Sequence, residues 1–458
     1  MLPASALGTA KPGQAGKPAA AGTLVQLPGP SGCLVDRSVT RSPCARARAL
    51  EEPAPLLGSR AVAVSPDGRN LYVASAASDA IAVFNRDARS GRLTQPKGAA
   101  GCIAAKGAGG CAPAIGLNGP NSVAVSPDGR NVYAASLVSE AVTVFDRNRT
   151  TGALSQLPGG GGCISGLAFP GCTNGRALVG PDVIVASPDG DNVYVGSFFG
   201  NAIAVFNRDP SSGALTQPGG GGGCLAETAT SGCATGIALE SIEGMAISRN
   251  GTSLYLGAAA SAAAVVLGRN PSSGALTQAT DGSGCIVSVP LAGCTTGAQL
   301  GGADAVAISP DGGDVYLTSL FSKSVTSFTR STASGLLTQK FGSAGCLVFL
   351  RSTGCSFGRA LSAPEGLAVS PDGFNLYVAS YAPGAIAVLA RDRRSGSVAQ
   401  KPHRAGCVGS LPDCSPARAL DGVGSLVLSP DGRYLYAAAS KSNAIAIFRR
   451  VTRQPHSG

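Results

Sequence analysis

Seven positions, one in each copy of an internal repeat, hold the side chains best suited to chemistry in this chain of 458 residues. Each position lies five residues before a recurring turn serine, and in chain order they are Arg60, Asn121, Asp182, Glu243, Asp304, Glu365 and Gly424. Carboxylate and amide oxygens are the hard ligands that Ca²⁺ and Mg²⁺ prefer. If these side chains converge, the sequence predicts a divalent cation held by Asn121, Asp182, Glu243, Asp304 and Glu365.

Several interpretations of these carboxylates are open at this point. A bound metal ion would polarise a carbonyl group of a substrate and activate water, which would make the protein a hydrolase. The same residues would also serve a structural ion or a cationic ligand. Alternatively, the carboxylates are solvated or accept backbone N–H groups, and Arg60 pairs with its neighbours. The two histidines, His403 and His456, occupy no repeated position, so neither a Ser-His-Asp nor a Cys-His arrangement is predicted, and the catalytic residues stay unassigned.

The fourteen cysteines form pairs along the chain, and the second member of a pair usually follows the first by nine residues. Zinc sites favour closer cysteines or histidine ligands, so the pairs predict seven disulfides within the repeats. This number of disulfides indicates an oxidising compartment, and we expect a protein that is secreted or part of the cell envelope. The predicted bridges are Cys33–Cys44, Cys102–Cys111, Cys163–Cys172, Cys224–Cys233, Cys285–Cys294, Cys346–Cys355 and Cys407–Cys414.

The repeat that must position these residues reads most clearly from residue 61 to residue 102. An apolar run at 61–64 precedes the turn Ser-Pro-Asp-Gly, in which Pro fixes φ and Gly accepts the left-handed conformation. Further strands are predicted at 71–75, at 80–84 and around 93–95. Four short antiparallel strands per repeat, in seven repeats, predict an all-β fold, the seven-bladed β-propeller. The turn serines, 61 residues apart except for a last interval of 59, are Ser65, Ser126, Ser187, Ser248, Ser309, Ser370 and Ser429.

The two ends of the chain are expected to close the ring. The last repeat stops after its third strand at Phe448, and a segment that matches the missing fourth strand lies at residues 24–27. An N-terminal strand would then complete the last blade and remove the exposed sheet edge. We expect a flexible leader or linker at 1–22, one propeller at 23–450 and a tail at 451–458. Residues 1–22 lack the continuous apolar segment of a signal peptide.

Residues 62–75, followed by residues 81–87 and the Gly-Arg-Leu-Thr at 91–94, carry a family resemblance. They resemble the lactonase-type seven-bladed propellers, a family that includes 6-phosphogluconolactonase-like and YVTN-repeat proteins. The resemblance covers residues 23–450 and implies the fold, whereas many members have no known substrate. Some members are thought to use His, Arg and Glu at the channel mouth, and no histidine here matches that pattern. The long cysteine-bearing insert between blades also departs from the shorter family repeat.

Two further residue types recur in all seven repeats. A tyrosine in each second strand is expected to be a packing residue with its hydroxyl at an edge: Tyr72, Tyr133, Tyr194, Tyr255, Tyr316, Tyr377 and Tyr436. An arginine lies 21 residues after each turn serine: Arg86, Arg147, Arg208, Arg269, Arg330, Arg391 and Arg450. We expect these guanidinium groups to satisfy a turn carbonyl or a nearby Asp such as Asp87. The alternative is a cationic ring for an anionic surface, consistent with the net charge of +10.

The sequence favours a secreted, disulfide-reinforced propeller that binds a small molecule, a protein or a cell-envelope ligand. Its crosslinked loops and its channel mouth are expected to share one face, which would be the binding face. The alternative is a lactonase-like hydrolase or isomerase with a metal ion at the mouth. A third hypothesis is a cell-envelope adhesion protein that uses the arginine face. No nucleic-acid module and no transmembrane segment are predicted, and we expect a monomer.

Overall fold

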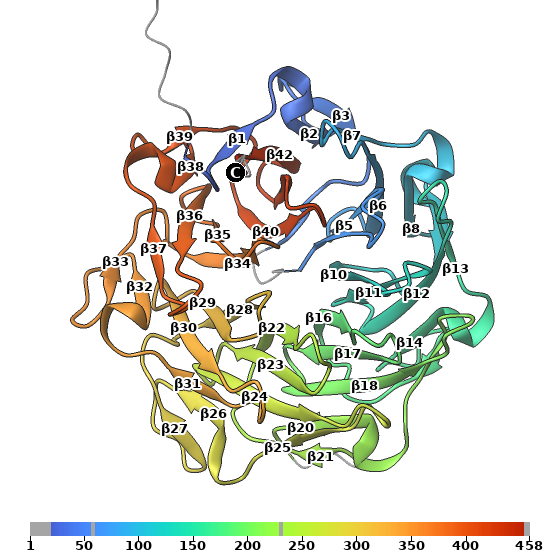
Figure 1. Ribbon diagram of the computed structural model, residues 1–458. Coiled ribbons are helices and arrows are strands. Elements are labelled where there is room, and N and C mark those ends of the chain that lie inside the picture. The colour runs from blue at the N-terminus through green and yellow to red at the C-terminus, as the bar shows by residue number, and fades with distance from the viewer. Residues whose placement is uncertain (1–19, 56–59, 229–231, 453–458) are drawn as a thin grey trace, which may run out of the picture.

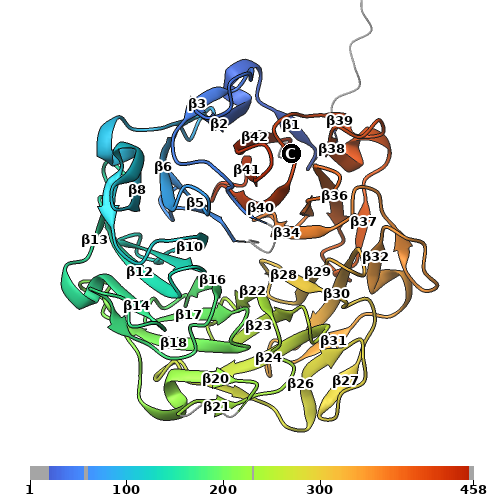
Figure 2. The same cartoon turned by 180° about the vertical axis from the view of Figure 1, so that it is seen from behind.

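The computed structural model describes residues 20–55, 60–228 and 232–452. These residues form seven sheets arranged as blades around a central axis (Figure 1), and the view from behind shows the same closed ring (Figure 2). We number the blades by their turn serine, so blade 1 contains Ser65 and blade 7 contains Ser429. The predicted all-β seven-bladed propeller is therefore confirmed. None of the helices in the described part of the chain has the length and apolar character needed to cross a membrane.

The first three strands of each blade follow the prediction from the repeat. They pair antiparallel in sequence order from the axis outward, and the Ser-Pro-Asp-Gly turn joins the first to the second, with the Gly68 N–H donating to the Ser65 carbonyl. The inner strands are β4 (Val62–Val64), β10 (Pro120–Val125), β16 (Pro181–Ala186), β22 (Ile242–Ile247), β28 (Ala303–Ile308), β34 (Pro364–Val369) and β40 (Val423–Leu428). The second strands are β5 (Asn70–Ser75), β11 (Asn131–Ser136), β17 (Asn192–Ser197), β23 (Ser253–Ala258), β29 (Asp314–Ser319), β35 (Asn375–Ser380) and β41 (Tyr434–Ala439). The third strands are β6 (Ala80–Arg86), β12 (Ala141–Arg147), β18 (Ala202–Arg208), β24 (Ala263–Arg269), β30 (Ser324–Arg330), β36 (Ala385–Arg391) and β42 (Ala444–Arg450).

The outer part of each blade differs from the prediction, because the sheets have six strands and not four. The fourth position is divided between two short strands that pair with opposite ends of the third strand, and a sixth strand pairs parallel to the second of them. The strands beside the arginine end are β7 (Leu93–Thr94), β13 (Leu154–Gln156), β19 (Leu215–Thr216), β25 (Leu276–Gln278), β31 (Leu337–Gln339), β37 (Val398–Gln400) and β1 (Leu24–Gln26). The strands beside the other end are β8 (Cys102–Ala105), β14 (Cys163–Ser165), β20 (Cys224–Ala226), β26 (Gly282–Val287), β32 (Cys346–Val348), β38 (Cys407–Gly409) and β2 (Cys33–Asp36). The outermost strands are β9 (Ala112–Ala114), β15 (Thr173–Asn174), β21 (Ala234–Thr235), β27 (Cys294–Thr296), β33 (Ser356–Phe357), β39 (Ser415–Pro416) and β3 (Ala45–Ala47).

The cysteine-bearing insert produces this extra structure. Short 3-10 turns interrupt the fourth position in most blades, and the seven predicted disulfides then fasten the returning chain to it, with Cα–Cα distances of 4.8 to 4.9 Å. Each bridge closes the loop between two parallel neighbours, which a tight hairpin cannot join. The 3-10 turns are η1 (Gly29–Gly32), η2 (Gly98–Gly101), η3 (Ala108–Gly110), η4 (Gly159–Gly162), η5 (Gly220–Gly223), η6 (Gly342–Ala344) and η7 (His403–Gly406).

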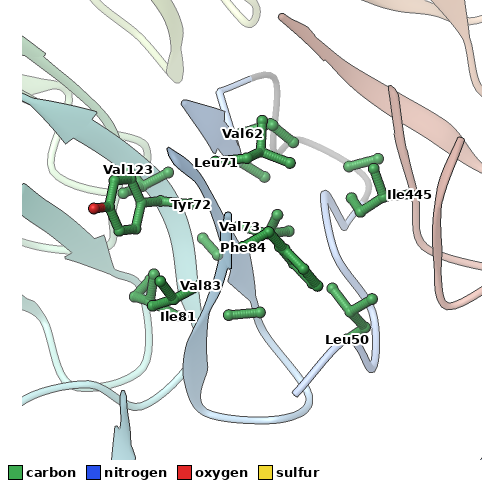
Figure 3. Packing of buried hydrophobic residues seen from close by; sticks show 14 of the residues in the cluster. Leu50, Val62, Leu71, Tyr72, Val73, Ile81, Val83, Phe84, Val123 and Ile445 are labelled. Atoms are coloured by element: carbon green, nitrogen blue, oxygen red, sulfur yellow. The ribbon is translucent and has the colours of Figure 1, made fainter. Parts of the chain in front are cut away.

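The core lies between the blades. Second and third strands bury both faces, since each blade is packed between two neighbours. Figure 3 shows this for blade 1, where Phe84 packs with apolar side chains of its own blade, and Ile445 of blade 7 and Val123 of blade 2 belong to the same cluster. The propeller is therefore stabilised mainly by apolar contacts between successive blades.

The recurrent tyrosine and arginine join the blades at the turn end. The Arg147 Nε donates to the Tyr72 hydroxyl of the preceding blade at 2.7 Å, and its Nη2 pairs with Asp67 of that blade's turn at 2.9 Å. The Tyr72 hydroxyl in turn donates to the Gly152 carbonyl, so it is buried at the seam and not at an edge. The predicted structural role is confirmed, although the acid is the preceding turn Asp and not a residue such as Asp87.

The alternative role of the arginines as a cationic surface is wrong, because all seven are 3 to 8 % exposed. Six of them form an ion pair with the Asp of the preceding turn. The exception is Arg330, whose preceding turn carries Asn250 in place of Asp. Its Nε still donates to Tyr255, and its buried Nη2 has no partner among the described residues.

The ring closes through the N-terminal segment, as predicted, but with three strands and not one. β1 and β2 pair with β42, and β3 pairs with β2, so residues 24–47 complete blade 7. Gly22 belongs to the predicted leader, but its carbonyl accepts a hydrogen bond from the Tyr377 hydroxyl. It therefore has the same role for Tyr377 that Gly152 has for Tyr72. The rest of the predicted leader (1–19) and the end of the tail (453–458) lie outside the described residues.

These contacts predict a sharp difference between two truncations. Removal of residues 1–19 leaves every described contact of the closing strands, whereas removal of residues 1–27 deletes β1 and leaves the buried Tyr377 hydroxyl without its acceptor. We expect the longer truncation to lower the melting temperature by about 5 °C or more, measured by calorimetry at fixed protein concentration. Equal melting temperatures for the two truncated proteins would show that β1 does not contribute to closure.

Candidate functional site: a buried carboxyl cluster at the axis

The acidic residues singled out by the sequence lie at the start of four successive inner strands. Asp182, Glu243, Asp304 and Glu365 are 0 to 3 % exposed, and Asn121 is 6 % exposed. We call Asp182, Glu243, Asp304 and Glu365 the carboxyl cluster. The expectation of an open, solvated mouth therefore does not hold at these positions, because the residues are buried below the surface of that face.

A break in strand register accounts for the direction of these side chains. Six of the seven inner strands, all except β4, shift register against their second strand at this place, for example between Pro120 and Ser122 and between Pro181 and Val183. In these two blades the extra residues on the inner strand are Asn121 and Asp182. Pairing with the second strand therefore does not set the direction of their side chains as it does for the neighbouring residues. Such bulges redirect a side chain and are frequent beside functional sites. No residue pattern in the repeat predicts these bulges.

Burial raises the pKa values of all four carboxyl groups, and repulsion from other members of the cluster adds to the rise for Glu243, Asp304 and Glu365. Burial raises the pKa of Asp182 to about 7, although the Asn121 amide donates to its Oδ1 at 2.9 Å and works against the rise. Burial raises the pKa of Glu365 to about 8, with Lys441 opposing and Asp182 adding to the shift. Burial and then the neighbouring carboxylates also raise the pKa values of Glu243 and Asp304. Asp182 and Glu365 belong to blades 3 and 6, so their interaction crosses the ring.

Several oxygens of the carboxyl cluster have no hydrogen-bond donor among the described residues. These are both carboxyl oxygens of Asp304, both of Glu365 and Oδ2 of Asp182. An ionised carboxylate that is buried without donors is strongly disfavoured. At neutral pH the cluster must therefore hold protons or accept a cation.

Glycines in two blades make room for the cluster. A Cβ atom on Gly244 or on Gly257 would lie 2.1 Å from the Asp304 carbonyl oxygen, so blade 5 approaches blade 4 closely at this point. A Cβ atom on Gly424 would lie 2.7 Å from Glu365 Oε2. Gly424 is the seventh position of the register, and it provides space for an acid from the neighbouring blade.

The other predicted members of the ring behave differently. No ion pair of the described residues includes Arg60, so the predicted neutralisation of the carboxylates by Arg60 is not formed. Arg60 instead lines the central channel. Within the described ranges, no three His, Cys, Asp or Glu side chains lie close enough together to hold one ion directly.

One recurrent residue was missed by the sequence reasoning. The Gln95 side chain accepts the Arg48 N–H and donates to the Arg48 carbonyl, which joins the end of one disulfide segment to the next blade. The same residue recurs in every blade, and this repetition was the available signal: Gln26, Gln95, Gln156, Gln217, Gln278, Gln339 and Gln400. These contacts fix the disulfide segments around the channel-mouth face.

The comparisons with known proteins agree with this architecture. Residues 58–160 match the family model described as lactonase, 7-bladed beta-propeller. No curated protein matches the chain. The resemblance to the lactonase-type propellers is therefore confirmed on the matched residues.

Solved structures share the fold at low sequence identity. The periplasmic gluconolactonase of Pseudomonas aeruginosa is 19 % identical, with a TM-score of 0.53 over 79 % of this chain and 87 % of that chain. A protein from Bacteroides uniformis, provisionally assigned as a 6-phosphogluconolactonase, is 19 % identical, with a TM-score of 0.53 over 81 % and 88 %. Its counterpart from Bacteroides fragilis is 18 % identical, with a TM-score of 0.52 over 75 % and 82 %. At this identity the likeness supports the fold alone.

Proposed function

Because the chain resembles the lactonase-type seven-bladed propellers, and because four carboxyl groups are buried at its axis, we propose that it is a secreted binding propeller. Its ligand site would be the carboxyl cluster and the channel-mouth face above it. The observation that carries this proposal is the set of buried carboxyl oxygens of Asp182, Asp304 and Glu365 that have no donor among the described residues. A fold that retains such groups against their desolvation cost is expected to use them.

A location outside the reducing cytoplasm is supported by the disulfides. All fourteen cysteines are paired, and such bridges persist in oxidising compartments. On the channel-mouth face, the connections between second and third strands expose Val138, Phe199 and Phe321, which are 63, 64 and 72 % accessible. Exposed apolar side chains of this size are typical of surfaces that contact another molecule.

The ligand chemistry that suits the carboxyl cluster is a cation. Oxygen donors alone favour Ca²⁺ or Mg²⁺, and the separation of the side chains suits an ion that keeps part of its hydration shell. Asp182, Glu243, Asp304 and Glu365 would surround it, and the Asn121 amide would orient Asp182. Binding would remove the repulsion among the carboxylates and hold all of them ionised at neutral pH.

The first test is the effect of inorganic cations on stability. We expect Ca²⁺ or Mg²⁺ to raise the melting temperature of protein treated with a chelator, because an ion that binds only the folded state stabilises it by about 2.7 kcal/mol at 100 times Kd. Asp182→Asn combined with Asp304→Asn should abolish the rise. Asp421→Asn, an exposed acid on the same face, is the matched control and should keep it. Titration calorimetry without heat for either ion, together with unchanged melting temperatures, would contradict the cation proposal.

A second candidate is a lactonase-like hydrolase. The match of residues 58–160 to the lactonase model favours it, and a cation at the axis would polarise a carbonyl oxygen of the substrate. Hydrolysis of a panel of sugar lactones, with and without Ca²⁺, separates the two candidates. Turnover that the Asp182→Asn and Asp304→Asn variant loses would favour the hydrolase, whereas cation binding without turnover would favour the binding protein.

A further inference from the structure

The central channel contains a second site, separate from the carboxyl cluster. A cavity of about 560 Å³ runs along the axis and is lined by inner strands of all seven blades. It begins at Arg60 and Ala305 and ends at the turns, where Pro371 and Pro430 are exposed. The cavity therefore opens on the turn face, opposite the channel-mouth face.

The side chains that line this cavity are mostly apolar, whereas polar atoms, chiefly of the backbone, make up about half of its surface. Apart from Arg60 and Ser429, every side chain that lines it is aliphatic or proline, with residues such as Val125, Ile247 and Ile308 near its open half. Inner strands are the first strand of each sheet, so no strand pairs with their axial edge. A ligand in the cavity would contact aliphatic side chains and the backbone of these edges, and burial of its own apolar surface would favour binding.

Arg60 is the one charged group in this wall. Its guanidinium makes no ion pair or side-chain hydrogen bond with any described residue. Burial lowers its pKa to about 10, and no carboxylate offsets the shift. By contrast, each of the seven recurrent arginines at the seams donates a hydrogen bond to a tyrosine hydroxyl. A half-buried cation that lacks an anion, at the inner end of a cavity lined by aliphatic side chains and backbone, is a group that a ligand can satisfy.

We propose that the channel binds a small monocarboxylate with an apolar body, which enters from the turn face. Its carboxylate pairs with the Arg60 guanidinium, whose planar fork matches two carboxylate oxygens. Its hydrocarbon part fills the cavity between the inner strands. The carboxyl cluster is formed by other side chains of the same channel. Binding of the monocarboxylate therefore does not require a cation at the carboxyl cluster.

Octanoate is the probe for this proposal, and titration calorimetry on the full, disulfide-bonded chain is the measurement. We expect octanoate to bind, octan-1-ol of equal chain length to bind at least about tenfold more weakly, and octylamine not to bind. Arg60→Gln should weaken octanoate binding about 10- to 100-fold, the range for loss of a charge-assisted hydrogen bond, and should leave octan-1-ol unchanged. Arg69→Gln, an exposed arginine on the turn face, is the matched control and should bind octanoate as the wild type does.

A second variant tests the cavity itself. Ala307 lines it, and Ala307→Leu should weaken octanoate and octan-1-ol alike by occupying the space for the hydrocarbon chain. The comparison of octanoate with octan-1-ol on the wild type needs no variant, so it stands even if Arg60→Gln does not fold. Absence of octanoate binding, equal affinity for the two probes, or wild-type affinity in a folded Arg60→Gln protein would each overturn the proposal. Octanoate binding that persists in the Asp182→Asn and Asp304→Asn variant would show the two sites to be independent.

Discussion

Stability measured without divalent cations is expected to fall as pH rises from 5 to 8. Burial raises the pKa of Asp182 to about 7 and of Glu365 to about 8 in the folded protein. The unfolded chain releases these protons near pH 4, so between the unfolded and the folded pKa the folded state binds more protons. Stability then decreases with pH over this window, and the decrease continues above pH 8 because the pKa of Glu243 is raised to about 9. Each such group contributes a loss of about 3 kcal/mol between pH 5 and 8.

The measurement is chemical unfolding in the presence of a chelator at several pH values. The aspartates of the turns do not interfere, because hydrogen bonds from the turn serine and from the paired arginine hold their pKa values below the usual range. Asp182→Asn combined with Asp304→Asn should be more stable than the wild type at pH 8 and should flatten the profile. Addition of Ca²⁺ to the wild type at pH 8 should restore stability if the cluster binds it. A flat wild-type profile would mean that the four carboxyl groups are solvated in solution.

Removal of a seam arginine is expected to destabilise the propeller by about 1.5–3 kcal/mol, the range for hydrogen bonds to a charged group. Arg147→Met keeps the stem of the side chain but removes its bonds to Tyr72, to Asp67 and to the Gly129 carbonyl. The buried Tyr72 hydroxyl then loses a partner that water does not replace, whereas Asp67 is exposed enough for water to take the place of the guanidinium. Calorimetry should show the loss as a lower melting temperature, with the disulfides intact in both proteins.

The chain contains its own control for this prediction. Arg330 occupies the same place in blade 5, but Asn250 replaces the aspartate of the preceding turn. Arg330→Met should therefore cost less than Arg147→Met, and Asn250→Asp should stabilise the wild type by supplying the missing carboxylate. Equal losses for the two arginine variants would show that the ion pair adds nothing to the bond with tyrosine.

Much of the fold could be predicted because its information is local and repeated. The turn beginning at Ser65, the apolar runs beside it and the cysteine pairs each depend on residues that are close in sequence. Seven copies at nearly constant spacing made the blade number and the ring closure evident. The resemblance to lactonase-type propellers followed from the same residues. The sixth strand was not predictable in this way, because the short segment after Cys111 forms a strand only when the disulfide holds it beside β8.

The site was predictable in composition but not in environment. The register identified Asp182, Glu243, Asp304 and Glu365 from sequence alone, and their convergence on the axis follows from propeller symmetry. Their burial, the bulges that direct them and the acid that pairs with each arginine were decided only by tertiary structure. The same holds for the separation of Arg60 from the acids and for the cavity that it lines. The bulges are register shifts within a blade that no residue pattern marks. The other features are contacts between blades, and they join residues one or more full repeats apart, whose distances no local pattern specifies.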